Sequence, residues 1–172
     1  EGITSLGEYC FSRCSSLTSI TLPKGITSLM GYSFYGCSSL TSITLPEGIT
    51  SLGEYCFGMC SSLTSITLPE GITSLMNCCF YGCSSLTNIS FPSSLKTLYY
   101  DTFGDAMQKK RITINAITPP KIGYSSDDAL IDSKCTLYVP KGTLATYKNT
   151  DPWYRAGAFY EGNPIDSITF PS

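Results

Sequence analysis

Apolar residues recur along this chain at a fixed interval of 23 residues, separated by stretches of serine, threonine and glycine. Residues 24–46 and 47–69 agree at 17 of 23 positions, so the hydrophobic period reflects a true sequence repeat. The apolar columns are Leu6, Leu29, Leu52, Leu75 and Leu98; Ile20, Ile43, Ile66, Ile89 and Ile112; and Phe11, Phe34, Phe57, Phe80 and Phe103. The pattern therefore predicts five repeats, namely 1–23, 24–46, 47–69, 70–92 and a degenerate 93–115.

Each repeat contains one segment with the alternation of a β-strand. In the first repeat, Ile20 and Leu22 are two residues apart and face one side of a strand, while Ser19 and Thr21 face the other. Pro23 ends the segment, because proline has no backbone N–H to donate to a neighbouring strand. We expect strands centred on Ile20, Ile43, Ile66, Ile89, Ile112, Leu137 and Ile168.

The other half of each repeat has a different spacing. Ile26, Leu29, Phe34 and Cys37 are three, five and three residues apart, which favours a short helical or 3₁₀ return arm. One coil of this kind cannot bury its own apolar side chains, whereas stacked coils can. We therefore predict an α/β repeat fold, a solenoid of leucine-rich-repeat type with one parallel β-sheet and short helical or 3₁₀ return arms.

The repeat weakens after residue 92 and is lost after residue 115, where Asn115 replaces the proline. Residues 136–140 and 167–171 still have the pattern of strands that end in proline, and 141–148 resembles a short helix. The last coil of a solenoid would otherwise expose its apolar side, so terminal coils are usually atypical. We expect residues 116–172 to form a divergent C-terminal capping module that packs on the repeats.

The unit Phe-x-x-Cys-x-x-Leu-x-x-Ile-x-Leu-Pro resembles the BspA-type leucine-rich repeats of bacterial surface proteins over residues 1–115. Residues 118–120 and 137–147 resemble the C-terminal module that often follows such repeats. The resemblance implies a secreted or cell-surface protein that acts in binding or adhesion to an extracellular protein or glycan, as a monomer, without catalysis or a cofactor. A spacer that projects another domain from the cell surface is the alternative.

Composition excludes several other classes of protein. The chain has no histidine, which removes Ser-His-Asp and Cys-His catalysis and every zinc site that needs imidazole. A net charge of −2 argues against a nucleic-acid-binding protein, and no apolar run is long enough to span a membrane. Because the chain begins at Glu1 without a leader, we expect a processed fragment of a longer protein.

The cysteines fall into columns. One column is Cys14, Cys37, Cys60 and Cys83, and the other is Cys10, Cys56 and Cys79, with Ser33 and Thr102 in the same column. A position that accepts serine, threonine or alanine needs a small side chain, so we interpret both columns as buried, unbridged structural ladders. Disulfides between neighbouring coils and a metal site remain alternatives, but parallel side chains give poor S–S geometry and paired Cys-x-x-Cys motifs are absent.

Two sets of side chains form the candidate binding face. The first set is the outward residues of the stacked strands, which form a flat and almost uncharged ladder. The second set is a column of tyrosines on the return arms. Tyrosine offers a large contact area at a low cost in conformational entropy, although packing along an edge is the simpler role. The candidate residues are Ser19, Thr21, Ser42, Thr44, Ser65, Thr67, Asn88, Ser90, Tyr9, Tyr32 and Tyr55.

Three further features are assigned no site. Asp127, Asp128 and Asp132 share a loop but lack the spacing of an EF-hand calcium loop. The basic cluster 109–111 is shorter than the patches that bind nucleic acids. The sequon 88–90 lies on an expected strand, and its glycosylation depends on the host cell.

Overall fold

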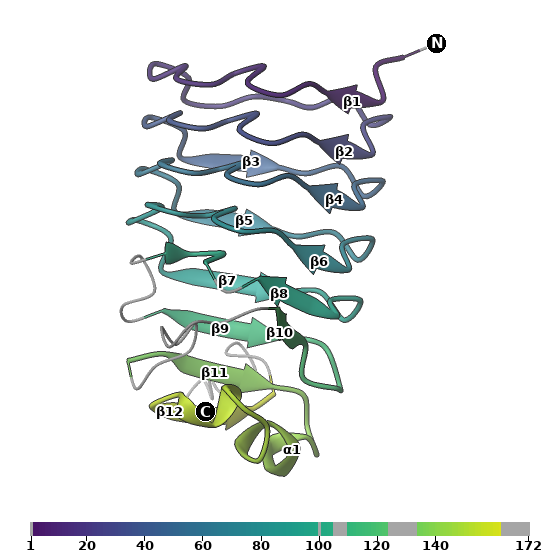
Figure 1. Ribbon diagram of the computed structural model, residues 1–172, viewed down its shortest axis with the longest axis vertical. Coiled ribbons are helices and arrows are strands. Elements are labelled where there is room, and N and C mark those ends of the chain that lie inside the picture. Colours follow the sequence, from purple (N-terminus) through teal and green to yellow (C-terminus); the bar gives the residue numbers. More distant parts are fainter. Residues whose placement is uncertain (1, 100, 105–109, 124–133, 163–172) are drawn as a thin grey trace, which may run out of the picture.

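The structure is a computed structural model that describes residues 2–99, 101–104, 110–123 and 134–162. The chain winds into stacked coils that form an elongated solenoid, with the N-terminal coil at one end and the C-terminal segment at the other (Figure 1). The predicted repeat solenoid is therefore confirmed. The sequence features that lie outside the described residues are Lys109, Asp127, Asp128, Asp132 and Ile168.

One layer of the solenoid is a six-stranded parallel sheet with the strand order β12-β11-β9-β7-β5-β3. Isoleucine pairs with isoleucine across the strands, for example Ile43 with Ile66 and Ile89 with Ile112. The first coil contributes only a bridge between Thr21 and Thr44, so the strand expected at Ile20 is reduced to a single pairing. The strands are β3 (Ser42–Thr44), β5 (Ser65–Thr67), β7 (Asn88–Phe91), β9 (Arg111–Ile114), β11 (Thr136–Val139) and β12 (Ala158–Glu161).

The opposite layer differs from the expected helical return arms. Its coils carry short parallel strands that form two three-stranded sheets, β1-β2-β4 and β10-β8-β6, so the predicted single sheet has two smaller companions. Backbone hydrogen bonds between neighbouring coils hold these strands together; for example, Thr27 N donates to Thr4 O at 2.8 Å. In a helix, the backbone hydrogen bonds would instead form within one coil. The strands are β1 (Ser5–Leu6), β2 (Ser28–Leu29), β4 (Ser51–Leu52), β6 (Ser74–Leu75), β8 (Thr97–Tyr99) and β10 (Lys121–Gly123).

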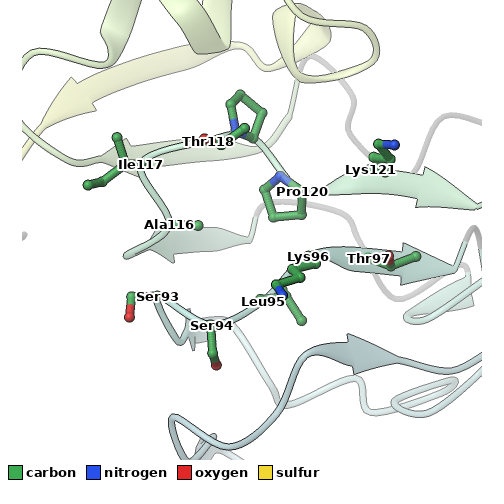
Figure 2. Close-up of a pocket in the computed structure, with 11 residues that line it drawn as sticks. Ser93, Ser94, Leu95, Lys96, Thr97, Ala116, Ile117, Thr118, Pro120 and Lys121 are labelled. Carbon is green, nitrogen blue, oxygen red and sulfur yellow. The ribbon is translucent and has the colours of Figure 1, made fainter.

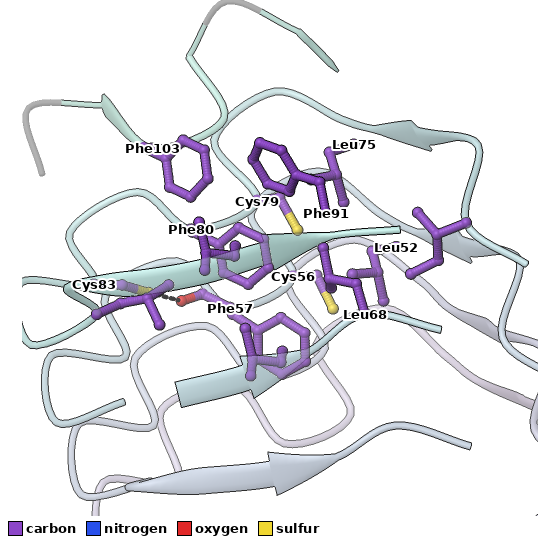
Figure 3. Packing of buried hydrophobic residues seen from close by; sticks show 14 of the residues in the cluster. Leu52, Cys56, Phe57, Leu68, Leu75, Cys79, Phe80, Cys83, Phe91 and Phe103 are labelled. Atoms are coloured by element: carbon purple, nitrogen blue, oxygen red, sulfur yellow. Dashed lines mark hydrogen bonds between the residues drawn. The ribbon is translucent and has the colours of Figure 1, made fainter. Parts of the chain in front are cut away.

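The core between the two layers consists of the predicted columns. Phe34, Phe57, Phe80 and Phe103 are fully buried, and consecutive rings stack with centroids 5.5–5.8 Å apart. Figure 3 shows the rings of Phe57, Phe80 and Phe103 beside buried leucines and cysteines of neighbouring coils. Phe11 in the first coil is only partly buried, because no coil covers its other side in the structure.

Neighbouring coils also fit together through an alternation of large residues and glycine. Tyr35 packs against Gly58 of the next coil, where a Cβ would be too close to the ring. Met59 covers Gly82 in the same way, since a Cβ there would lie 2.5 Å from its Sδ. Large residues thus occupy alternate coils at each of these two positions, and the structural unit is a pair of coils.

The C-terminal segment continues the solenoid and then folds back on it. Strand β11 pairs with β9 in register, and helix α1 (Leu144–Lys148) and the 3₁₀ helix η2 (Trp153–Arg155) follow. Tyr147 and Trp153 are fully buried: Tyr147 Oη donates to Ala116 O at 2.7 Å and Trp153 Nε1 to Pro120 O at 2.9 Å. Strand β12 then pairs with β11, and the sequence did not predict β12 because it lacks the serine-isoleucine motif.

The degenerate fifth repeat buries a lysine. Lys110 is 2% exposed, its Nζ donates to the carbonyl oxygen of Leu86, and it lies 5.9 Å from the centroid of the Phe103 ring. Burial lowers the pKa of Lys110, although the neighbouring thiols of Cys83 and Cys135 raise it. The core of the fifth repeat therefore contains an amine. In the sequence of this repeat, Lys109 stands where the first four repeats have leucine.

Candidate binding surfaces

Five tyrosines of the return arms form one cluster, here called the tyrosine stripe: Tyr9, Tyr32, Tyr55, Tyr35 and Tyr81. Tyr9, Tyr32 and Tyr55 stack one above another with centroids 4.9 Å apart and planes inclined by 13°. Tyr35 meets Tyr32 and Tyr55 edge-on, and Tyr81 meets Tyr55 edge-on. Tyr9 is 57% exposed and the others are half-buried, so the stripe presents aromatic surface to solvent.

The backbone of the stacked tyrosines is unusual. Tyr9, Tyr32 and Tyr55 have φ values of 58°, 57° and 52°, in the left-handed region, and Cys78 continues the column at 56°. This conformation costs about 1–2 kcal/mol for a residue with a Cβ, and glycine would adopt it freely. The fold thus holds large aromatic residues at positions where local sterics favour glycine.

The surroundings of Tyr32 and Tyr55 keep these two phenols neutral. Burial raises the pKa of Tyr32, and the neighbouring Tyr9 and Glu54 add to the effect. The pKa of Tyr55 is raised chiefly by its hydrogen bond with Cys78, and then by burial. Neutral rings next to carboxylates are suited to contact and stacking, and they are poor acids and bases near neutral pH.

The serine and threonine ladder lies on the opposite layer of the solenoid. In β3 and β5 the outer residues Ser42, Thr44, Ser65 and Thr67 are exposed while the isoleucines between them are buried. The ladder includes exposed Ser19, Thr21 and Asn88 and half-buried Ser90, and Tyr138 and Tyr160 stack at 5.3 Å at its C-terminal end. The structure therefore does not bring the two predicted sets together: they form two separate surfaces.

Several residues of these surfaces were not singled out from the sequence. Met30, Met59 and Met76 are 48%, 43% and 38% exposed on the return arms. The sequence does contain a pattern that marks such positions, because methionine alternates with glycine at one position of successive repeats, as in Gly7, Met30, Gly53 and Met76.

The cysteine columns are coil-to-coil hydrogen-bond donors. Cys37, Cys60 and Cys83 each direct Sγ to the carbonyl oxygen of the phenylalanine in the preceding coil, at 3.1, 3.1 and 3.0 Å. In the other column Ser33 Oγ has two carbonyl acceptors, Met30 O of its own coil at 2.6 Å and Gly7 O of the preceding coil at 3.2 Å, so a hydroxyl can replace the thiol there. None of the column cysteines is in a disulfide; Cys10 and Cys14 are exposed in the first coil and Cys37, Cys56, Cys60, Cys79 and Cys83 are buried.

An open hollow of about 680 Å³ lies where the fifth repeat meets the C-terminal segment. Residues 93–97 form one wall and 116–121 the other (Figure 2). Lys96 and Lys121 are the charged residues of its lining, which contains no carboxylate and no thiol. Within the described ranges, no three His, Cys, Asp or Glu side chains gather as metal ligands would.

Solved structures with the same fold include a bacterial cell surface protein. A leucine rich cell surface protein from Faecalibacterium prausnitzii is 22% identical, with a TM-score of 0.59 over 98% of this chain and 38% of its own. A leucine-rich repeat protein of T. pallidum is 18% identical, with a TM-score of 0.57 over 89% of this chain and 74% of its own. The pneumococcal vaccine antigen PcpA is also 18% identical, with a TM-score of 0.57 over 93% of this chain and 44% of its own.

These structural similarities establish the fold. The chain spans well under half the length of the Faecalibacterium protein. No curated protein matches the chain. Among the described residues, no helix is long and apolar enough to cross a membrane.

A family model counts six copies of the repeat over residues 2–126, one more than the five predicted up to residue 115. The structure shows how the pattern continues beyond residue 115, since β10 pairs with β8 and places Ile122 beside Leu98 of the leucine column. The chain belongs to the family described as the BspA type leucine rich repeat region.

Proposed function

We propose that this chain is a non-enzymatic binding or adhesion module of a secreted or cell-surface bacterial protein, and that it holds an extracellular protein or glycan through the tyrosine stripe. The observation that carries the proposal is the left-handed backbone of Tyr9, Tyr32 and Tyr55. A strained conformation that persists in three successive coils points to a role for the side chains that it presents. Packing alone would be served by glycine there, with less strain.

The binding role is favoured over the alternative of a spacer. A spacer needs a rigid array, which the buried columns already supply, and gains nothing from exposed aromatic rings. Exposed tyrosine and methionine side chains are typical of contact surfaces, because they supply a large and adaptable area. Catalysis has no support in the chemistry of the chain, which lacks histidine.

The extracellular setting is part of the same proposal. The Faecalibacterium protein that shares the fold is described as a cell surface protein. The polar strand ladder of β3, β5 and β7 is a second candidate surface on the opposite layer, and the experiment below separates it from the stripe.

The test compares two variants with the parent chain on an array of extracellular matrix proteins and glycans. In the stripe variant Tyr9, Tyr32 and Tyr55 are replaced by glycine, which accepts the backbone conformation. In the matched ladder variant Ser42, Thr44 and Thr67 are replaced by alanine. Loss of binding in the stripe variant alone supports the proposal, provided that circular dichroism shows both variants folded. Loss in the ladder variant alone would move the site to the strand face, and a parent chain that binds nothing on the array would favour the spacer.

A further inference from the structure

Acidic side chains accompany the tyrosine stripe at every second coil. Glu8 and Glu54 occupy the position directly before Tyr9 and Tyr55, and both are exposed. Two coils beyond Glu54, half-buried Asp101 follows Cys78 in the tyrosine column. Neighbouring return arms join directly at these residues, since Tyr32 N donates to Glu54 O and Cys78 N to Asp101 O, both at 2.9 Å. The carboxylate of Glu54 also raises the pKa of Tyr32 and that of Asp101 the pKa of Tyr55, so these two acids and the rings share one surface.

The stripe carries almost no positive charge. In the return-arm segments 7–13, 30–36, 53–59 and 76–82, all of which the structure describes, Arg13 is the one basic residue. It lies at the N-terminal end, where its side chain covers Gly36. Carboxylates beside aromatic faces form a site for cations, because a guanidinium or ammonium can stack on the ring and pair with the acid.

The spacing of the acids selects one conformation of a polypeptide partner. Stacked coils are about 4.8 Å apart, so Glu8 and Glu54, which share one column and lie two coils apart, are separated by about 9.6 Å. A polyproline-II helix rises about 3.1 Å per residue with three residues per turn, so every third side chain lies on one face at about 9.3 Å. The two periods agree closely from Glu8 to Glu54, and Asp101 lies two coils beyond Glu54, one position further along its arm.

We propose that the tyrosine stripe binds an extended, polyproline-II-like polypeptide segment with arginine or lysine at every third residue. The segment runs along the solenoid axis. Each basic side chain pairs with Glu8, Glu54 or Asp101, and the prolines between them pack on the tyrosine rings, as prolines do in other aromatic-lined recognition sites. The inference rests on the proposed function, in which the stripe is the binding surface, and it specifies the class of partner.

The experiment measures fluorescence anisotropy with labelled twelve-residue peptides and the whole chain. The first peptide is Pro-Pro-Arg repeated four times, and the second has the same composition with its four arginines adjacent. The third peptide, Pro-Pro-Glu repeated four times, tests charge. We expect the first peptide to bind several-fold more tightly than the second, the third not to bind, and salt to weaken binding.

Two substitutions in one coil give a matched control. Glu54→Gln and Glu47→Gln each remove one exposed carboxylate from the third repeat, but Glu47 lies in the turn after β3, away from the stripe. Glu54→Gln should weaken binding of the first peptide about threefold to fivefold, and Glu47→Gln by less than about twofold.

Each contrary result overturns a defined part of the idea. Equal affinity for the two arginine peptides would refute the polyproline-II register, and equal effects of the two glutamine variants would refute the location. If no peptide binds while the chain still captures a protein or glycan through the stripe, the partner class is wrong and the proposed function stands. If neither peptides nor array components bind, both proposals fail.

Discussion

The ring of Tyr35 lies so close to Gly58 that a Cβ at Gly58 would stand 2.9 Å from Cδ2 of the ring, and 3.1 Å from Cδ1 of Tyr55. We predict that Gly58→Ala lowers the free energy of unfolding by about 1–3 kcal/mol, because two packed rings must move. Urea unfolding would measure the change.

Gly7→Ala is the control for this prediction, since nothing lies within 4 Å of a Cβ there. The double variant Tyr35→Ala with Gly58→Ala should lose less stability than the two single changes added together, because removing the ring makes room for the methyl group. A Gly58→Ala protein as stable as Gly7→Ala would show that the coils are less tightly fitted than described.

Phe57 lies in the middle of the phenylalanine column, fully buried between Phe34 at 5.5 Å and Phe80 at 5.8 Å. We predict that Phe57→Ala lowers the free energy of unfolding by about 3–5 kcal/mol, from lost burial and an unfilled cavity. Thr67→Ala on the exposed strand face should cost less than about 0.5 kcal/mol. Comparable costs for the two changes in denaturant titrations would mean that the inner and outer faces are reversed.

Stability should fall as the pH rises above about 8.5, the pKa of an unperturbed thiol. Burial raises the pKa of Cys37 to about 11 and that of Cys83 to about 12, and it raises those of Cys56, Cys60 and Cys79 as well. Below pH 8.5 both the folded and unfolded chains keep these thiols protonated. At higher pH the unfolded chain loses protons first and is favoured, until the folded thiols also titrate.

Urea midpoints at pH 7, 8, 9 and 10, with reductant present, would measure this decline. Lys110 opposes it, because burial lowers the pKa of this amine, but it is a single group against several thiols. Replacing Cys56 and Cys79 by serine, the residue found at position 33 of the same column, should make the decline shallower. A stability that stays constant to pH 10 would contradict the burial of the thiols.

Lys110→Met should leave stability unchanged or raise it by about 1 kcal/mol, because an apolar side chain of similar length needs no desolvation of an amine. Lys110→Ala should lower stability, since it also leaves a cavity beside Phe103. Thermal unfolding of the two variants would separate these effects. A large loss in Lys110→Met would show that the hydrogen bond to Leu86 is needed for the fold.

Deleting residues 116–172 should give a protein that aggregates or unfolds at markedly lower denaturant. The deletion removes Tyr147 and Trp153, and it uncovers the apolar side of β9 where β11 now pairs. Size-exclusion chromatography and urea unfolding of residues 1–115 would test the proposed capping role. A truncated chain that stays monomeric with unchanged stability would mean that the segment is a separate module.

Much of the fold could be predicted because the repeat places identical residues in register. Two-residue alternation around Ile43 or Ile66 requires a strand with one buried face, and a 23-residue period then stacks those strands in parallel. The return arms were harder, because the spacings of three residues from Ile26 to Leu29 and five from Leu29 to Phe34 also fit turns and short strands. Strand β12, with the sequence Ala-Phe-Tyr-Glu, has no serine-isoleucine motif like that of β3 and β5, and no proline stands directly after it.

The candidate surfaces were only partly predictable. The sequence identifies Tyr32 and Thr44 as outward residues of repeated columns, but it does not say that the columns lie on opposite layers. That separation depends on where the chain turns between its two strands in each coil. The left-handed backbone of Tyr32 was also invisible in the sequence, because tyrosine is not a residue that signals positive φ.

The alternation of large residues and glycine restricts how such an array can gain or lose repeats in evolution. Removal of residues 47–69 alone would bring Tyr35 against Tyr81 and leave Gly36 facing Gly82, with a clash at one position and a void at the next. Removal of 47–92 as a pair would keep the order of large residues and glycines intact. Recombination between copies is therefore tolerated in steps of two coils, and each such step lengthens or shortens the aromatic surface by one complete set of side chains.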